Sequence, residues 1–279
     1  MKPVYYEFCG IPIEIHAPRP LPDPAEQFLT DETSPQIHIT ITSCRELPRP
    51  EGSFLGRSGE KQIWRKRSKI IRVSLDRFCP QPHMAAGYDL ENWNWINAWI
   101  RQEYWCWAAG SRYLWTGLAL PQILLHAGVL LFHASYIICE GQGILFTAPS
   151  QTGKSTQAEL WRRCRGAEII NGDKAAVRLD SIPTAYSVPF SGTSGICQNS
   201  SCPLKAMVVL SQAPQNTIRP MAPAEAVAAL CPNMFGEQIV EEEWNQALNL
   251  LLKLTTEVPI YALACTPDER AVKALEQVL

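Results

Sequence analysis

The chain has 279 residues, of which 46% are hydrophobic and 19% are charged, and its formal net charge is −2. This composition is typical of a globular protein and excludes a disordered chain. Because charges of the two signs almost cancel, we expect neither nucleic acid nor an anionic membrane surface as a partner.

Short strands separated by loops predict a β-rich region over residues 1–115. Apolar and polar residues alternate in Gln36–Thr42, which is typical of a half-buried strand. Proline fixes φ and removes a backbone donor, so we expect loops at Pro18–Pro24 and Pro48–Gly59. The other strands expected here are Val4–Phe8, Ile11–His16, Gln62–Trp64 and Lys69–Leu75.

Two segments of this region allow both a structural and a functional interpretation. The basic residues near the last expected strand fit its solvated face, with phosphate or nucleic-acid binding as the alternative. These residues are Arg65, Lys66, Arg67, Lys69 and Arg72. The tryptophan-rich segment Asn92–Cys106 predicts a packed helix, with a base-stacking platform as the alternative.

Residues 116–279 have the pattern of an α/β domain. Proline, glycine and polar residues interrupt the apolar stretch Leu114–Cys139, so we expect a buried helix at Ile123–Leu125 and then a buried strand, not a membrane span. The sequence starts without a secretory signal, and its cysteines are scattered without a Cys-x-x-Cys pair. We therefore expect a cytoplasmic protein with reduced thiols.

A hairpin precedes the next helix in this second region. Its strands are expected at Tyr136–Cys139 and Ile144–Thr147, with Gly141 and Gly143 supplying positive φ in the turn. A helix is expected from Gly153 to Cys164, with Gly166 as its terminator. Further strands are expected at Glu168–Asn171, Ala206–Leu210 and Pro259–Ala264, and further helices at Ala222–Leu230, Glu242–Thr256 and Asp268–Val278.

The segment Ala148–Ser155 fits the phosphate-binding loop (P-loop) pattern, with alanine in the place of the first glycine. A loop that leaves a strand and enters a helix directs successive backbone N–H groups at an anion. Gly153 allows close approach of the backbone, Lys154 supplies a cation, and the Ser155 hydroxyl can hold Mg²⁺. We therefore predict ATP and Mg²⁺ as ligands, with an ordinary helix start as the alternative. The residues expected at the nucleotide are Ala148, Pro149, Ser150, Gln151, Thr152, Gly153, Lys154, Ser155 and Thr156.

The sequence around this loop resembles the catalytic core of HPr kinase/phosphorylase. His133 precedes Gly153 by 20 residues at the head of the hairpin, as a histidine does in that family. Asn171-Gly172-Asp173 follows the next strand, where the family has a pair of aspartates. The resemblance extends to the nucleotide core of phosphoenolpyruvate carboxykinases. It implies an α/β fold with a P-loop core of this type and a mixed sheet, preceded by a smaller β-rich region.

Residues 125–200 carry most of this resemblance, and within them the sequence departs from the family at several places. Gly172 replaces the first aspartate, Gln151 a loop glycine and Thr156 an acidic residue. Val188–Gly195 is the counterpart of the family's arginine-containing glycine-rich segment. The sequence is closer to divergent HPr-kinase-like proteins associated with modified-peptide biosynthesis.

The resemblance implies ATP-dependent transfer of a phosphoryl group to a hydroxyl. The implied acceptor is serine of a peptide or small protein, such as a precursor peptide. Asp173 would be the catalytic carboxylate and, with Ser155, a metal ligand, while His133 and Lys154 would contact phosphate. The structural alternatives are a turn residue for Asp173 and a satisfied core residue for His133.

Other features leave alternatives open. Lys174 is expected in solvent, with phosphate binding as its alternative, and the polar loop Ser191–Ser194 is either an acceptor-side loop or only a turn. Carboxykinase-like chemistry on a small carboxylate is one competing function. A catalytically inactive nucleotide-binding module of a peptide-modifying complex is the other. Homo-oligomerisation also stays open.

Overall fold

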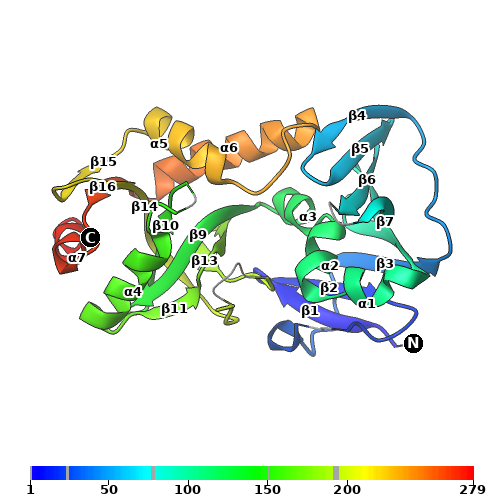
Figure 1. Ribbon diagram of the computed structural model, residues 1–279, viewed down its shortest axis with the longest axis horizontal. Coiled ribbons are helices and arrows are strands. Elements are labelled where there is room, and N and C mark those ends of the chain that lie inside the picture. The colour runs from blue at the N-terminus through cyan, green and yellow to red at the C-terminus, as the bar shows by residue number, and fades with distance from the viewer. Residues whose placement is uncertain (1, 23–24, 77–78, 150, 191–194) are drawn as a thin grey trace. The chain divides into compact units, whose positions relative to one another are not determined.

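The computed structural model describes residues 2–22, 25–76, 79–149, 151–190 and 195–279. Within these ranges the chain has a mixed α/β fold, with two mixed sheets and a β-rich N-terminal region (Figure 1). The chain divides into two compact units. One unit contains Met1–His126 and Glu237–Trp244, and the other contains Ala127–Gly236 and Asn245–Leu279.

The strands of the first unit form one sheet in the order β1-β2-β3-β8-β7-β6-β5-β4. In it β2, β3 and β8 run parallel, and the other neighbours are antiparallel. Short helices follow the last strand. The elements are β1 (Val4–Phe8), β2 (Ile11–His16), β3 (Ile37–Cys44), β4 (Ser53–Ser58), β5 (Lys61–Lys66), β6 (Lys69–Asp76), β7 (Cys79–Asp89), β8 (Trp95–Arg101), α1 (Trp105–Ala108), α2 (Ser111–Gly117) and α3 (Leu120–His126).

Two expectations for the secondary structure of this region are wrong. The middle of the tryptophan-rich segment, Trp95–Arg101, forms strand β8, because burial alternates along it: Ile96, Ala98 and Ile100 are buried, whereas Trp95 is exposed. This period of two is that of a strand with one face on the core. The expected loop Pro48–Gly59 contains β4, which is the edge strand of the sheet and is mostly exposed.

The basic residues around β6 do not share one solvated face. Lys66, Arg67 and Lys69 are exposed, but Arg72 is only 1% exposed. Its Nε donates to Glu237 over 2.8 Å within the same unit. The expectation of solvation is therefore wrong for Arg72, whose charge is compensated inside the protein.

The second unit has a sheet in the order β10-β9-β12-β13-β14-β16-β15, with β11 on β9 and an additional pairing of β10 with β14. The strand β9 is long enough to pair with β12 in its first half and with β10 and β11 in its second. The elements are β9 (Val129–Cys139), β10 (Gln142–Thr147), α4 (Lys154–Arg165), β11 (Glu168–Asn171), β12 (Lys174–Leu179), β13 (Pro183–Tyr186), β14 (Ser201–Gln212), β15 (Thr217–Pro220), α5 (Pro223–Leu230), α6 (Glu241–Glu257), β16 (Ile260–Cys265) and α7 (Glu269–Glu276).

The turn between β9 and β10 differs in one residue from the expectation. Positive φ is found at Glu140 and Gly141, with values of 52° and 75°. Gly143 lies instead inside β10, where a Cβ would come within 3.2 Å of Tyr136 and 3.1 Å of Cys202. Gly143 is thus required by close packing and not by the turn.

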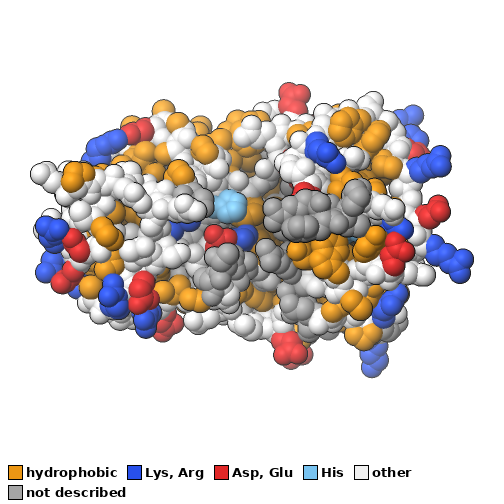
Figure 2. All heavy atoms as spheres, viewed as in Figure 1, with side chains coloured by type: hydrophobic (Ala, Val, Ile, Leu, Met, Phe, Trp, Pro, Cys, Tyr) orange, Lys and Arg blue, Asp and Glu red, His pale blue; other side chains and the backbone are white. Residues whose placement is uncertain are grey.

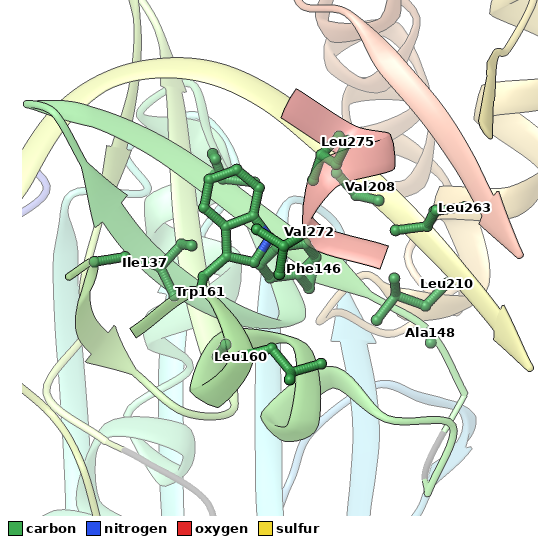
Figure 3. Packing of buried hydrophobic residues seen from close by; sticks show 13 residues of the cluster. Ile137, Phe146, Ala148, Leu160, Trp161, Val208, Leu210, Leu263, Val272 and Leu275 are labelled. Carbon is green, nitrogen blue, oxygen red and sulfur yellow. The ribbon is translucent and has the colours of Figure 1, made fainter. Parts of the chain in front are cut away.

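The strands β10, β14 and β16 run parallel, so their carboxyl ends lie at one edge of the sheet. Figure 3 shows the apolar cluster beneath this edge, in which Trp161 of α4 and Leu275 of α7 meet strand residues such as Phe146 and Leu263. In open α/β sheets, ligands bind outside the carboxyl ends of such strands. The β10–α4 loop lies at this edge and is therefore a candidate ligand site.

Charges of both signs are distributed over the visible surface. Figure 2 shows acidic and basic side chains interspersed over the visible face, with hydrophobic side chains between them. In the described part of the chain, no helix combines the length and the apolar character that a membrane span needs.

Candidate functional site

The loop that joins β10 to α4 is fixed at both ends. Ala148, its first residue, is buried in the apolar cluster, and Lys154 opens the helix. Gly153 has φ 119°, a value that side chains disfavour, and Gln151 has φ 64°. Of the predicted contact residues, Ser150 lies outside the described residues, as does the loop Ser191–Ser194.

The first turn of α4 presents backbone N–H groups without a side-chain cap. No acidic side chain lies in this turn, all of whose residues are described. The hydroxyl-bearing residues Ser155 and Thr156 are exposed there. Lys154 turns back over the loop, and its Nζ donates to the carbonyl of Ala148 over 2.9 Å. Orphan N–H groups and a nearby cation make this helix end suited to an anion.

His133 lies on β9 next to the start of this loop. The hydroxyl of Thr147, the last residue of β10, donates to the His133 carbonyl over 3.0 Å. The imidazole is half-buried and stacks on the ring of Phe235 with centroids 3.9 Å apart. Strand pairing therefore places this histidine beside the loop, as the sequence separation predicts.

Asp173 lies in a short break between β11 and β12, both of which pair with β9. The buried Asn171 shapes the break, because its Oδ1 accepts hydrogen bonds from the N–H groups of Asp173 and Lys174 over 3.1 and 3.0 Å. The Asp173 carbonyl accepts from the N–H of Ala134, the neighbour of His133, over 3.0 Å. The break thus brings Asp173 to the level of His133.

Lys174 is not the solvated residue that the sequence suggests. Its Nζ donates to Oδ2 of Asp173 over 2.8 Å, and its side chain is 15% exposed. The same ammonium group lies 5.4 Å from the ring centre of Phe235 and 5.9 Å from that of Phe190, within the range of cation–π attraction. Lys174 therefore lies near the rings of Phe190 and Phe235 and holds the Asp173 carboxylate in place by its hydrogen bond.

Four titratable groups interact electrostatically in this neighbourhood. Burial lowers the pKa of His133, with Lys174 and Lys154 adding to the effect and Asp173 opposing it. Burial also lowers the pKa of Lys154, against the attraction of Asp173. Burial alone would raise the pKa of Asp173, but the Lys174 hydrogen bond and the nearby positive charges, that of Lys174 first, outweigh it and lower the pKa. Asp173 is therefore ionised and His133 uncharged at neutral pH.

A cavity of about 490 Å³ opens beside the first turn of α4. It lies at the carboxyl ends of β14 and β16, which end at Gln212 and Cys265. Gln212 also reaches the loop, because its Nε2 donates to the carbonyl of Gln151 over 3.4 Å. The lining residues are Gln151, Thr152, Gly153, Thr156, Gln157, Leu210, Gln212, Ala213, Cys265, Thr266 and Pro267.

Comparison with known families places this chain. The family described as "SynChlorMet cassette protein ScmC" matches residues 118–279, which is more than half of the chain. The chain belongs to the ScmC family. No curated protein matches it. Among solved structures, the Hpr(Ser) kinase/phosphatase from Coxiella burnetii is similar with a TM-score of 0.31 and 12% identity, over 53% of this chain and 91% of that one.

Reasoning from the sequence missed several residues of this ScmC family member's site. Phe235 stacks on His133 from a segment about a hundred residues away, and no local signal marks it. Asn171 was expected only as the end of a strand, although an asparagine before Gly172 is a signal for the turn that it forms. The cavity residues on β14 and β16 come together only through strand pairing.

Proposed function

We propose that this ScmC family member is an ATP-dependent kinase that transfers a phosphoryl group to a hydroxyl. The observation that carries the proposal is the grouping of Lys154 at the head of α4 with His133, Asp173 and Lys174. Phosphoryl transfer is catalysed mostly by positioning and by neutralising charge, and this grouping offers residues for both.

The phosphates would lie over the N-terminus of α4. The uncapped N–H groups of its first turn would donate to phosphate oxygens. Lys154 would exchange the carbonyl of Ala148 for the β- and γ-phosphates, so that a weak neutral acceptor is replaced by an anion. An uncharged His133 would donate one hydrogen bond to phosphate and add no positive charge.

The residues present fit a magnesium ion. Ser155 offers an exposed hydroxyl, and Asp173 offers a carboxylate that its lowered pKa keeps ionised. Mg²⁺ commonly takes one or two protein ligands and completes its shell with water and phosphate oxygens. When bound, the ion would neutralise charge on the phosphates.

Asp173 would orient the acceptor hydroxyl and receive its proton. A carboxylate with a lowered pKa is a weak base, but the loose transition state of phosphoryl transfer requires little deprotonation before attack. Lys174 would keep the carboxylate in one position during this step. Positioning is therefore the main contribution that we assign to Asp173.

A serine of a peptide or small protein is the acceptor that we propose. This choice rests on the resemblance of the sequence to kinases of modified-peptide biosynthesis. It agrees with a family whose description is that of a cassette protein. Where a precursor peptide is encoded beside this chain, it is therefore the first acceptor to test.

The proposal is tested with the full chain, Mg²⁺, ATP labelled on the γ-phosphate and such a precursor peptide. We expect label on serine, and loss of both ATP binding and transfer in Lys154→Ala. Lys253→Ala is the matched control, because Lys253 also donates to a backbone carbonyl, that of Leu179 at 3.0 Å, away from the site. Binding of ATP without transfer to any supplied hydroxyl would indicate an inactive nucleotide-binding module. No binding of ATP would make Ala148–Ser155 an ordinary helix start.

A further inference from the structure

The sheet of the first unit ends in a strand whose outer edge is open. β4 is the last strand of that sheet, and among the described residues no other strand pairs with its second side (Figure 1). An edge strand has backbone N–H and C=O groups that point away from the sheet, and proteins usually keep such edges short, charged or covered. In β4, however, Phe54 is 51% exposed and Leu55 is 38% exposed. Apolar side chains on an open edge indicate a surface for a binding partner.

The pairing of β4 with β5 shows which side chains share a face. Phe54 lies opposite Trp64, and Arg57 lies opposite Gln62. Because Gln62 and Trp64 are two residues apart on β5, these two and the residues opposite them lie on one face, and so does Lys66. The rings of Phe54 and Trp64 pack on each other, with centroids 5.1 Å apart. This face therefore carries an aromatic pair with a cation on either side.

The other face of β4 and β5 is already covered within the first unit. A Cβ at Gly56 would lie 3.4 Å from Ile239. Arg65 pairs with Glu242 at 2.6 Å. Ile239 and Glu242 both belong to Glu237–Trp244, the late segment of this unit. The strand thus offers its aromatic face and its open edge to another molecule.

The charge of this surface indicates the kind of molecule. Of the exposed charged side chains in residues 49–69, five are cations and two are anions, although the whole chain has a net charge of −2. The cations are Arg49, Arg57, Lys66, Arg67 and Lys69, and the anions are Glu51 and Glu60. Glu51 pairs with Lys66 at 2.5 Å, but both side chains are more than half exposed, so the pair is weak in water. The surface therefore favours an acidic partner.

Two other occupants fit this surface less well than an extended peptide. Edge-to-edge pairing with a second copy of the chain would bring the same cations together, which is unfavourable. A nucleic acid matches the cations, but its phosphodiester backbone has no N–H donors to continue the hydrogen bonds of a strand edge. An extended peptide supplies these hydrogen bonds, and its alternate side chains can contact the aromatic pair and the cations.

We propose that the open edge of β4 binds an extended acidic segment of the acceptor peptide. The segment would add a strand to the sheet, with an apolar residue at Phe54 and Trp64 and acidic residues toward Arg57 and Lys66. Alternate residues of a strand face the same way, so the matching pattern is acidic-x-apolar-x-acidic. The serine that receives the phosphoryl group would lie outside this segment. The inference rests on the proposed function, because that function supplies a peptide as the substrate.

Binding is tested without ATP, by the fluorescence anisotropy of a labelled synthetic peptide, Thr-Glu-Thr-Leu-Thr-Glu-Thr, titrated with the full chain. We expect Arg57→Glu to weaken binding at least about fivefold, because it places like charges together. Phe54→Thr should weaken it severalfold, because it removes the aromatic ring and retains strand propensity. Arg45→Glu is the matched control: Arg45 is also exposed, but it follows β3, which four strands separate from β4 in the sheet.

Changes in the peptide distinguish strand addition from charge attraction alone. Two peptides, each N-methylated on one alternate set of amides, keep every charge. The set that faces β4 should lose at least about tenfold in affinity, and the set that faces solvent should lose little. Replacing both glutamates of the peptide by lysine should abolish binding.

Several results would overturn the docking surface. One is equal binding of the peptide by the unmodified protein and Arg57→Glu, and another is equal binding of the two methylated peptides. A dimer of the full chain that Phe54→Thr dissociates in analytical ultracentrifugation would show that a second copy occupies the edge. Tighter binding of a single-stranded DNA oligomer than of the peptide, at about 0.15 M salt, would show a nucleic-acid surface.

The outcome for the proposed function is measured separately, by transfer from ATP to a peptide that carries this segment and a serine. Arg57→Glu should raise the KM for this peptide and leave kcat unchanged. Binding of the peptide at β4 without any transfer would refute the kinase and leave the docking surface standing. Transfer with the same KM in Arg57→Glu and the unmodified protein would refute the docking surface and leave the kinase standing.

Discussion

Asp173 has separate structural and chemical contacts, and this separation makes its role testable. Its backbone makes the structural contacts, which are the hydrogen bonds with Asn171 and Ala134. Its carboxylate has the ion pair with Lys174 at 2.8 Å. A change confined to the side chain can therefore remove the chemistry and keep the backbone contacts.

We expect Asp173→Asn to slow phosphoryl transfer by at least about 10²-fold while leaving the fold and most ATP binding intact. An amide has nearly the shape of a carboxylate, but it carries no charge, so it would hold the acceptor hydroxyl more weakly and receives no proton near neutral pH. The measurement is single-turnover transfer to the peptide at saturating ATP. Asp180→Asn is the control, because Asp180 is an exposed carboxylate after β12 that pairs with Arg178 at 2.7 Å. An undiminished rate in Asp173→Asn would exclude Asp173 as the essential carboxylate.

His133 should make the stability of the protein depend on pH. Burial lowers its pKa in the folded state, so the unfolded chain binds this proton more readily. The stability that the uncharged imidazole contributes is fully present above the pKa of histidine in the unfolded chain, about 6.5. It is lost as the pH falls toward the lower pKa of His133 in the folded state. We expect urea titrations at pH 7.5 and 5.5 to show a smaller loss of unfolding free energy in His133→Asn than in the unmodified protein. An equal loss in the two proteins would contradict a half-buried imidazole that is uncharged at neutral pH.

At the scale of elements, α4 has a glycine with positive φ at each end. Gly153 precedes it at 119°, and Gly166 follows it at 67°. A Cβ at either position would meet no atom within 4 Å, so substitution would cost conformational strain and not a collision. The two glycines differ only in what lies beside them, since Gly153 belongs to the proposed phosphate loop and Gly166 to a plain helix end.

We therefore expect Gly153→Ala and Gly166→Ala each to lower the free energy of unfolding by about 1–3 kcal/mol. Only Gly153→Ala should also weaken the binding of ATP, because relief of its strain would turn the loop N–H groups away from the phosphates. Thermal unfolding and ATP titration of both variants measure the two effects. Equal weakening of ATP by both would show that helix stability, and not loop geometry, controls binding.

Local signals explain which elements the sequence predicts. The hairpin of β9 and β10 follows from two short apolar runs around glycines, and helix α4 follows from the segment after Gly153; the structure contains the hairpin and the helix. The strand β8 differs from the expected helix because its signal is the spacing of two between Ile96, Ala98 and Ile100, while its tryptophans occur at mixed spacing. β4 is an edge strand with little buried surface, so its sequence has no strong alternation.

One part of the candidate site could also be predicted from local sequence, and another part could not. The neighbourhood of His133, Lys154 and Asp173 could be predicted because a motif fixes their separations along the chain. The cavity could not, because Leu210 and Cys265 reach it only through the pairing of β14 with β10 and β16. The Lys174–Asp173 pair depends on the break that Asn171 shapes, which composition does not specify.

At the scale of the whole molecule, a late segment of the chain completes the first unit. Glu237–Trp244 belongs to the unit built by Met1–His126. In that unit the buried Arg72 donates to Glu237 over 2.8 Å and to Glu243 over 2.6 Å. The first unit therefore needs the carboxylates of a segment that the chain reaches only after most of the second unit.

We expect Arg72→Met to lower the free energy of unfolding of the first unit by about 3–5 kcal/mol, because it leaves buried carboxylates without their partner. Tryptophan fluorescence in urea measures this unit, since every tryptophan except Trp161 lies in it. Arg65→Met is the matched control: Arg65 pairs with Glu242 of the same segment at 2.6 Å, but the Glu242 side chain is 49% exposed.

An exposed pair of this kind contributes about 0–1 kcal/mol, so Arg65→Met should shift the transition little. Adding Glu243→Gln to Arg72→Met should recover part of the loss, because it removes a buried negative charge that has lost its arginine. Equal effects of the two arginine substitutions, or no recovery in the double variant, would contradict the view that buried charge pairing attaches Glu237–Trp244 to the first unit. The segment would then be held by the packing of apolar residues such as the buried Val240.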